Sequence, residues 1–236
     1  MPKIVTSRGV IKYKTRPIFL GVKKIDKEQA TENLLLLKEV LDKKNLKFGL
    51  IAGTLLGAVR EKDFIEHDED IDLFFMQEDK ELLMDSLHDL LAVGFEVARY
   101  DGSELMSIIR KGEYIDLYIF HKDIENVRNC SGWCVPEYFL TETTLLEFKG
   151  AMFVVPKEYE EFLIYEYGEN WKTPIQYVSF DMSPLKRKLL ESKEYIKEHM
   201  PRALYNMIAG RKAKQRREFD LKRIENYEKK RKERIK

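Results

Sequence analysis

Cysteine is scarce in this sequence, which has two in 236 residues. Cys130 and Cys134 are too few for the disulfide framework of a secreted domain, and two ligands do not make a zinc site, so we expect free thiols. No stretch approaches the roughly 18 apolar residues of a membrane-spanning helix. The first residues, MPKIVTSRGV, contain no apolar run of signal-peptide length. These absences argue against a disulfide-rich or membrane-spanning protein, and we expect a cytoplasmic one.

The net charge of +1 conceals an uneven distribution. Residues 1–24 contain seven Lys or Arg and no acid, residues 25–184 carry a net charge of −17, and residues 185–236 carry +11. We therefore predict a basic N-terminal arm (1–24), a globular domain (25–184) and a basic helical extension (185–236). The acidic domain lacks the cationic surface that nucleic-acid binding requires, so we expect no nucleic-acid partner. The extension has few apolar residues, so we expect it to fray; it is either solvated or in contact with an anionic membrane.

The most informative stretch runs from Phe48 to Asp72. It predicts a strand at 48–52, a glycine-bounded turn into a helix at 53–60, a polar loop, and a second strand at 70–75. Successive side chains of a strand point to opposite faces, so Asp70 and Asp72 share a face. Two carboxylates this close repel each other unless a cation lies between them, and Mg²⁺ prefers oxygen ligands. An isolated Asp-x-Asp is more often a solvated acidic turn, so the pair alone does not define a site.

Two further features favour a site. Residues 113–120 alternate like a strand, and Asp116 lies in the middle of that apolar run, where a carboxylate is costly without a partner. If the two strands pair, Asp116 can complete a cluster of three carboxylates. Gly53 and Thr54 open a helix directly after a buried strand, where backbone N–H groups and the helix dipole form a phosphate cradle. The combination favours transfer of a phosphorus group from a nucleotide-type donor.

The chain resembles the LicD/fukutin-type phosphotransferases, a branch of the nucleotidyltransferase fold superfamily, in four motifs. These are G-T-L-L-G-A-V-R, F-I-x-x-D-E-D-I-D, I-D-L-Y and V-P-K-E-Y-E-E-F-L-I-Y-E-Y-G-E-N-W-K-T-P. The resemblance covers about residues 34–174. It implies an α/β (α+β) fold, with a small mixed sheet of the nucleotidyltransferase type, packed helices and a C-terminal helical extension. One departure is Glu66-His67, where the family often has Pro-Trp; these side chains would line the mouth of the site.

The resemblance also implies a function. It implies transfer of a substituted phosphate, such as phosphocholine or ribitol phosphate, from a CDP-alcohol to a hydroxyl of a cell-surface glycan or its lipid-linked precursor, as in modification of lipopolysaccharide or teichoic acid. Two alternatives stay open. One is a nucleotidyltransferase that moves a nucleoside monophosphate from a triphosphate to a small molecule or sugar phosphate. The other is a non-catalytic interaction protein whose basic tail does the binding.

Six residues form the expected site. Asp70 and Asp72 would hold Mg²⁺ (or Mn²⁺), and Asp116 would complete the site as a third ligand or as the base that accepts the acceptor's proton. Gly53 and Thr54 would cradle the donor phosphates. Arg60, at the end of the short helix, would hold a phosphate oxygen, although a cation there could simply cap the helix.

The rest of the chain yields element predictions with less bearing on chemistry. We expect helices at 26–44 (with Asp26 as N-cap), 79–92, 157–167, 185–199 and 202–235; Pro201 separates the last two, and a further break is expected near Gly210. We expect strands at 95–100, 104–110 and 152–155, with a tight hairpin at Lys111–Gly112. Residues 123–147 show no regular pattern. Trp133 and Tyr138 are expected in the core, and Tyr167 and Trp171 are weaker candidates for donor contacts.

Overall fold

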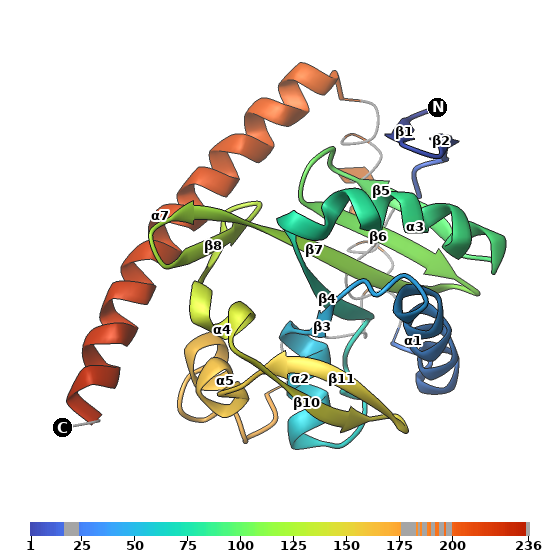
Figure 1. Ribbon diagram of the computed structural model, residues 1–236. Helices are drawn as coiled ribbons and strands as arrows, with labels where there is room; N and C mark the ends of the chain where they lie inside the picture. The colour runs from blue at the N-terminus through green and yellow to red at the C-terminus, as the bar shows by residue number, and fades with distance from the viewer. Residues whose placement is uncertain are drawn as a thin grey trace.

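The computed structural model describes residues 1–16, 24–175 and 200–234, together with 183, 185, 188, 189, 192, 193 and 196. It is an α+β fold in which a nine-stranded mixed sheet carries helices on both faces (Figure 1). The strands are β3 (Gly49–Leu50), β4 (Asp70–Met76), β5 (Glu96–Tyr100), β6 (Leu105–Arg110), β7 (Glu113–Ile124), β8 (Val127–Cys130), β9 (Trp133–Pro136), β10 (Thr143–Phe148) and β11 (Ala151–Pro156). The helices are α1 (Lys27–Asp42), α2 (Ala52–Arg60), the 3₁₀ turn η1 (Gln77–Asp79), α3 (Lys80–Ala92), α4 (Glu137–Thr141), α5 (Tyr159–Tyr167) and α7 (Arg202–Arg234).

The sheet is ordered β10-β11-β3-β4-β7-β6-β5, and β8 and β9 extend it from the far end of β7. Most neighbours are antiparallel, but β4 runs parallel to β7, and β11 runs parallel to β3. The parallel pair requires a crossover, which α3, β5 and β6 supply. The mixed sheet therefore places β4 and β7, which carry the sequence-predicted aspartates, side by side at its centre.

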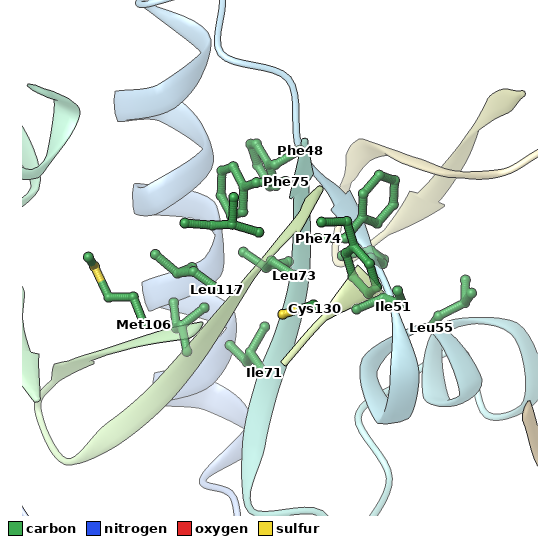
Figure 2. Packing of buried hydrophobic residues seen from close by; sticks show 14 of the residues in the cluster. Phe48, Ile51, Leu55, Ile71, Leu73, Phe74, Phe75, Met106, Leu117 and Cys130 are labelled. Carbon is green, nitrogen blue, oxygen red and sulfur yellow. The ribbon is translucent and has the colours of Figure 1, made fainter. Parts of the chain in front are cut away.

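The hydrophobic core lies on both sides of β4, whose residues from Ile71 to Phe75 are all buried. Alternate side chains of this strand point in opposite directions: Leu73 lies on the side of α1, whereas Phe74 lies toward Leu55 of α2 (Figure 2). Burial on both faces explains why the strand reads as a nearly continuous apolar run after its two aspartates. The core thus fixes β4 from both sides and leaves its first residues to the site.

Helix α1 begins where the sequence predicts. The side chain of Asp26 accepts hydrogen bonds from the backbone N–H groups of Glu28 and Gln29, which would otherwise lack partners in the first turn. Arg110 and Lys111, at the β6–β7 turn, pair with Glu32 of this helix. These ion pairs tie helix α1 to the end of the sheet where β7 begins, shortly before Asp116.

The N-terminal arm is partly structured. Strands β1 (Lys3–Thr6) and β2 (Gly9–Lys12) form a separate antiparallel hairpin that contacts α3. Arg8 pairs with Asp89, and Ser7 hydrogen-bonds Asp85. The sequence predicted at most an edge strand here, because basic residues and short apolar runs do not reveal a hairpin.

The predicted elements exist within a few residues of their expected bounds, with two differences. Residues 123–147, which showed no regular pattern, form the end of β7, β8, β9, α4 and most of β10. The strand predicted at 48–52 is reduced to the two residues of β3, because α2 already begins at Ala52. The helix predicted at 185–199 falls mostly outside the described residues. Trp133 is buried in the core as expected, Tyr138 packs against it half-buried, and both cysteines are buried free thiols.

Helix α7 continues unbroken through Gly210 and lies along the β8–β9 hairpin and α5 (Figure 1). Ile224 and Tyr227 are buried, and Asp220 accepts a hydrogen bond from the backbone N–H of Cys134. Fraying was therefore the wrong expectation for this part of the helix, because a narrow stripe of residues every three or four positions is enough to anchor it. Among the described residues, no helix has the length and apolar character needed to cross a membrane.

Candidate active site

The site is organised by the register between β4 and β7. Asp72 lies directly opposite Asp116 in this parallel pair, and Asp70 lies opposite Tyr114. Because side chains two residues apart share a face, all three aspartates project from one face of the sheet. The predicted pairing of the two strands is confirmed, and the structure brings together the carboxylates that the sequence singled out.

These carboxylates are buried among like charges. Asp72 is 7% exposed and Asp116 is 5% exposed. Burial raises the pKa of Asp72 well above its ordinary value, and the charges of Asp68 and Asp116 raise it further. Burial also raises the pKa of Asp70, with added repulsion from Asp72 and Asp116. A cluster of buried carboxylates of this kind is unfavourable by itself, and a bound cation would relieve the repulsion.

Asp116 differs from Asp70 and Asp72 because an arginine of the described residues pairs with it. Arg99 of β5 donates to one of its oxygens at 3.1 Å, and the Ser107 hydroxyl of β6 donates to the other. Burial raises the pKa of Asp116, while Arg99 and Ser107 act in the opposite direction. Arg99 also donates to Ser107 at 3.1 Å, so that the three side chains form one network across strands β5, β6 and β7.

The turn from β3 into α2 holds the other side of Asp72. The backbone N–H of Gly53 donates to the Asp72 carboxylate at 3.1 Å, and the backbone N–H of Asp72 donates to the Thr54 hydroxyl at 2.8 Å. Thr54 is fully buried. Gly53 and Thr54 are therefore both hydrogen-bonded to Asp72 in this structure. A donor phosphate would share the Gly53 N–H with the Asp72 carboxylate.

Backbone strain accompanies this turn. Ala52 has a φ of +50°, in the left-handed region that a residue with a Cβ adopts only at a cost of about 1 kcal/mol. Gly53 has no room for a side chain, because a Cβ there would collide with the carboxylate of Asp68. The glycine is thus required by the close approach of Asp68 and not by a turn conformation alone.

Asp68 is a fourth carboxylate in the site. It lies in the loop before β4, against Gly53, and its side chain accepts the backbone N–H of Glu69. Burial raises its pKa to about 6, and the charges of Glu69 and Glu61 add to that rise. Asp68 acts on the charge of Asp72 and also lines the neighbouring cavity, so it lies between the carboxylate cluster and that cavity.

That cavity has a volume of about 470 Å³ and lies beside Gly53 and Asp68. Its walls also include Arg60, Glu66, His67, Tyr167 and Trp171. A volume of this order is typical of small-molecule sites, which run from roughly 300 to 1,000 Å³. Burial raises the pKa of Tyr167, and the charge of Asp72 adds to it, so the phenol lies close to the carboxylates.

Arg60 ends α2 and faces this cavity. One of its terminal nitrogens donates to the Trp171 carbonyl at 3.1 Å and another pairs with Glu61 at 2.7 Å. Its Nε is buried, with no acceptor among the described residues. A buried donor without a partner is costly, so this nitrogen is suited to an anion that arrives with a ligand.

The residues present fit a hard divalent cation in their chemistry. Asp70, Asp72 and Asp116 supply only oxygens, as Mg²⁺ and Mn²⁺ prefer, and a cation would relieve their repulsion. Within the described part of the chain, no group of three acidic, histidine or cysteine side chains is already gathered closely enough to hold an ion. Each oxygen of Asp116 already accepts one hydrogen bond, from Ser107 or from Arg99, and a cation would share this carboxylate with them.

Sequence reasoning missed the residues that surround the three aspartates. Arg99, Ser107 and Tyr118 were not singled out, although Tyr118 follows Asp116 on the same face of β7. Burial raises the pKa of the Tyr118 phenol, and the charges of Asp72 and Asp116 add to it. Its hydrogen bonding in turn favours the ionised forms of both aspartates. The sequence could have revealed Ser107. The predicted two-residue hairpin at Lys111–Gly112 sets the register of β6 against β7, and this register places Ser107 opposite Asp116.

Comparison with known proteins identifies the domain. Residues 45–158 match the family model described as the LicD/FKTN/FKRP nucleotidyltransferase domain. The chain is similar to an uncharacterized protein of Rickettsia typhi, with 30% identity over 115 residues that cover 49% of this chain and 36% of that protein. It is also similar to the human ribitol-5-phosphate transferase FKTN, with 25% identity over 170 residues that cover 67% of this chain and 36% of that protein. The matched part spans about a third of the length of these relatives.

Solved structures with a similar arrangement include nucleotide-transferring enzymes. A lincosamide antibiotic adenylyltransferase, LnuA, aligns with a TM-score of 0.42 at 14% identity, covering 68% of this chain and 96% of that one. The antibiotic-resistance factor ANT(2'')-Ia aligns with a TM-score of 0.44 at 15% identity, covering 80% of this chain and 94% of that one. The family match spans β3, α2, β4 and β7, which carry every aspartate of the cluster. Residues 45–158 therefore form a domain similar to that of the LicD/fukutin-type family, as the motifs predicted.

Proposed function

We propose that this protein transfers a substituted phosphate, such as phosphocholine or ribitol phosphate, from a CDP-alcohol to a hydroxyl of a cell-surface glycan or its lipid-linked precursor, with Mg²⁺ or Mn²⁺ as cofactor. The observation that carries the proposal is the register of Asp72 against Asp116, which concentrates uncompensated negative charge beside a cavity of ligand size. The similarity to a ribitol-5-phosphate transferase supports this choice of reaction class.

The carboxylates would hold the cofactor. Asp70 and Asp72 are free of cationic partners among the described residues and would be its first ligands; Asp116 would join them, or act as the base for the acceptor hydroxyl. When bound, the metal would neutralise charge on the donor phosphates and orient the attacking and leaving oxygens. Tyr118 would keep Asp72 and Asp116 ionised through its hydrogen bonding.

The cavity beside the cluster would take the donor. The unpartnered Nε of Arg60 offers a hydrogen bond to a phosphate oxygen, and the N-terminus of α2 at Gly53 adds the positive end of a helix dipole. Tyr167 and Trp171 would pack on the alcohol or the base. Glu66 and His67, at the mouth, would contact whichever part of the donor extends toward solvent, and so would affect the choice of alcohol.

The products distinguish this reaction from nucleotidyl transfer. Attack on the phosphorus that bears the alcohol releases CMP and leaves the phospho-alcohol on the acceptor. Attack on a nucleoside triphosphate at the nucleotide-side phosphorus releases pyrophosphate and leaves a nucleotide on the acceptor. We expect Mg²⁺-dependent release of CMP from a CDP-alcohol. Phosphorus NMR of reactions with a panel of CDP-alcohols and triphosphates measures this release.

The matched control is Asp72→Asn, which keeps the fold but lacks the charge, and should release no CMP. Pyrophosphate formed from CTP, with inert CDP-alcohols, would identify a nucleotidyltransferase instead. If no donor turns over and no divalent cation binds, the protein is a non-catalytic member of its family.

A further inference from the structure

Helix α7 has one face committed to the rest of the protein. The residues that face the rest of the protein recur every three or four positions; they are Ala213, Arg217, Asp220, Ile224, Tyr227 and Arg231. Arg217 pairs with Asp123 at 2.6 Å, and Arg231 pairs with Glu158 at 2.5 Å. Ala213 packs so closely on the backbone of Gly132 that any side chain at this glycine would collide with it. The helix is therefore held in one orientation, with its opposite side turned outward.

The outward side combines exposed apolar and basic side chains. Leu204, Met207 and Phe219 are 41%, 47% and 67% exposed. The basic side chains of the same side are exposed and have no acidic partner among the described residues; they are Arg211, Lys212, Lys214, Lys222, Lys229 and Lys230. We call these three apolar and six basic residues the outer face of α7; Glu218, Glu225 and Glu233 are exposed on the same side and offset part of its positive charge. Because an α-helix turns every 3.6 residues, positions 204, 211, 222 and 229 line up along one side, with Phe219 beside them.

This face has the composition of a helix that lies on an anionic bilayer. Basic side chains are attracted to anionic headgroups, while apolar side chains between them enter the boundary with the acyl chains. A nucleic acid would use the basic residues but would have little use for Leu204 and Met207. Helix α7 also extends beyond the sheet at its N-terminal end, so its outer face offers a long line of contact to a flat surface (Figure 1).

We propose that the outer face of α7 docks the protein on an anionic lipid surface. The inner face keeps the helix attached to the domain, so that docking places the whole domain at the membrane and requires no loose tail. The proposal stands apart from the reaction proposed above, because none of its residues belongs to the carboxylate cluster or its cavity.

The test is co-sedimentation of the full chain with vesicles of phosphatidylcholine, with and without phosphatidylglycerol. We expect binding only to vesicles that contain phosphatidylglycerol, and less binding at high salt because screening weakens surface charge interactions. The variant Lys212→Glu/Lys222→Glu/Lys229→Glu should weaken that binding by at least about a hundredfold, because each lysine is close to the surface. The variant Met207→Ser/Phe219→Ser should weaken it by about tenfold or more, because two buried side chains are lost.

The matched control reverses the same amount of charge elsewhere. Lys12, Lys47 and Lys157 are exposed lysines of other surfaces, and their triple replacement by Glu should leave binding within about twofold of the wild type. All variants change exposed side chains, and urea unfolding verifies that each is folded. Absence of binding by the wild-type protein, or equal losses in the two triple variants, overturns the proposal. A dimer in solution that depends on Met207 and Phe219, without vesicle binding, would show that a second copy occupies this face instead.

Discussion

Partly or fully buried carboxylates gather in two regions of this protein, and the two regions differ in whether arginines pair with them. Under α7, Glu166 is paired with Arg223 at 3.2 Å, and Asp123 is paired with Arg217. At the β4–β7 centre, Asp70 and Asp72 have no cationic partner among the described residues, and Arg99, which reaches the cluster, pairs with Asp116. Both regions bury acidic groups, but only the first matches them with arginines.

The pKa directions show the same contrast. The hydrogen bonds of Arg217 lower the pKa of Asp123. Burial raises the pKa of Glu166, but Arg223 opposes that rise. At the centre, burial and neighbouring acids act together on Asp70 and Asp72. An acid supplied with its own cation contributes to the fold, whereas a cluster left without one is a place for a ligand.

The largest expected effect comes from removing charge at the centre. Asp72→Asn should lower turnover by at least about a thousandfold, since the metal contributes several kcal/mol to the transition state. The metal-free protein should be as stable as before or more so, because the asparagine oxygen can still accept the Gly53 N–H while repulsion falls. Steady-state kinetics and urea unfolding measure the two effects. Loss of stability in the metal-free variant would mean that Asp72 is a structural residue.

Removing a charge under α7 should lower the stability of the protein, in contrast to removing one at the centre. Arg223→Met leaves Glu166 buried without its cation and should lower the free energy of unfolding by about 2–3 kcal/mol, somewhat less than for a fully buried pair because Arg223 is partly exposed. Arg216→Met is the matched control: its contact with Asp220 is long, at 3.8 Å, and exposed, so we expect less than about 0.5 kcal/mol. Equal effects of the two variants in urea unfolding would contradict the distinction between the regions.

The pH dependence of stability should reveal Asp68. Its pKa is about 6 in the folded protein and about 3.9 in an unfolded chain. The folded state therefore holds the proton more tightly, so this group stabilises the protein fully below about pH 4, and that contribution is lost as the pH rises through about 6. The full loss amounts to about 3 kcal/mol in the metal-free protein, of which about 2 kcal/mol falls between pH 4 and pH 6.5.

Asp68→Asn isolates that contribution from other titrating groups. The difference in free energy of unfolding between the wild type and this variant should change by about 2 kcal/mol between pH 4 and pH 6.5 without metal. The same difference should flatten in excess Mg²⁺ if the cation compensates the cluster. A pH-independent difference without metal would show that Asp68 titrates as an ordinary exposed acid.

The smallest effect concerns the arginine that the centre does contain. Arg99→Met should strengthen Mn²⁺ binding by about fivefold, because Asp116 is then released from an ion pair worth about 1 kcal/mol at a partly exposed site. The metal-free protein should lose about 1 kcal/mol of stability for the same reason. Arg110→Met breaks a pair with Glu32 away from the site and should leave the affinity unchanged. Weaker Mn²⁺ binding by Arg99→Met in calorimetric titration would mean that Arg99 helps to build the site.

The sequence predicts the parts of the site that depend on local pattern. Alternation places Asp70 and Asp72 on one face, and the apolar run around Asp116 identifies its strand as central. The tight turn at Lys111–Gly112 also sets the register of β6 against β7, because pairing Arg110 with Glu113 places Ser107 opposite Asp116. That step was available from the sequence, and following the ladder would have found Ser107.

Other parts depend on contacts that no local pattern encodes. Arg99 reaches Asp116 across a register shift between Val97 and Arg99 in β5, which alternation cannot anticipate. Asp68 approaches Gly53 because of the path of a polar loop. The docking of α7 rests on a few anchors such as Ile224 and Tyr227 within a strongly charged helix, so composition suggested a frayed segment.

The parallel pairing of β4 with β7 has a consequence for how this chain can change in length. A residue inserted within Asp70–Met76 or Glu113–Phe120 would turn an aspartate to the opposite face and separate the cluster. The crossover between them is under no such constraint, and its exposed turn at Gly102, where nothing lies close to the glycine, can grow or shrink without moving either strand. A search for distant members of this family should therefore fix the spacing inside each strand and leave the gap between the two aspartate motifs open.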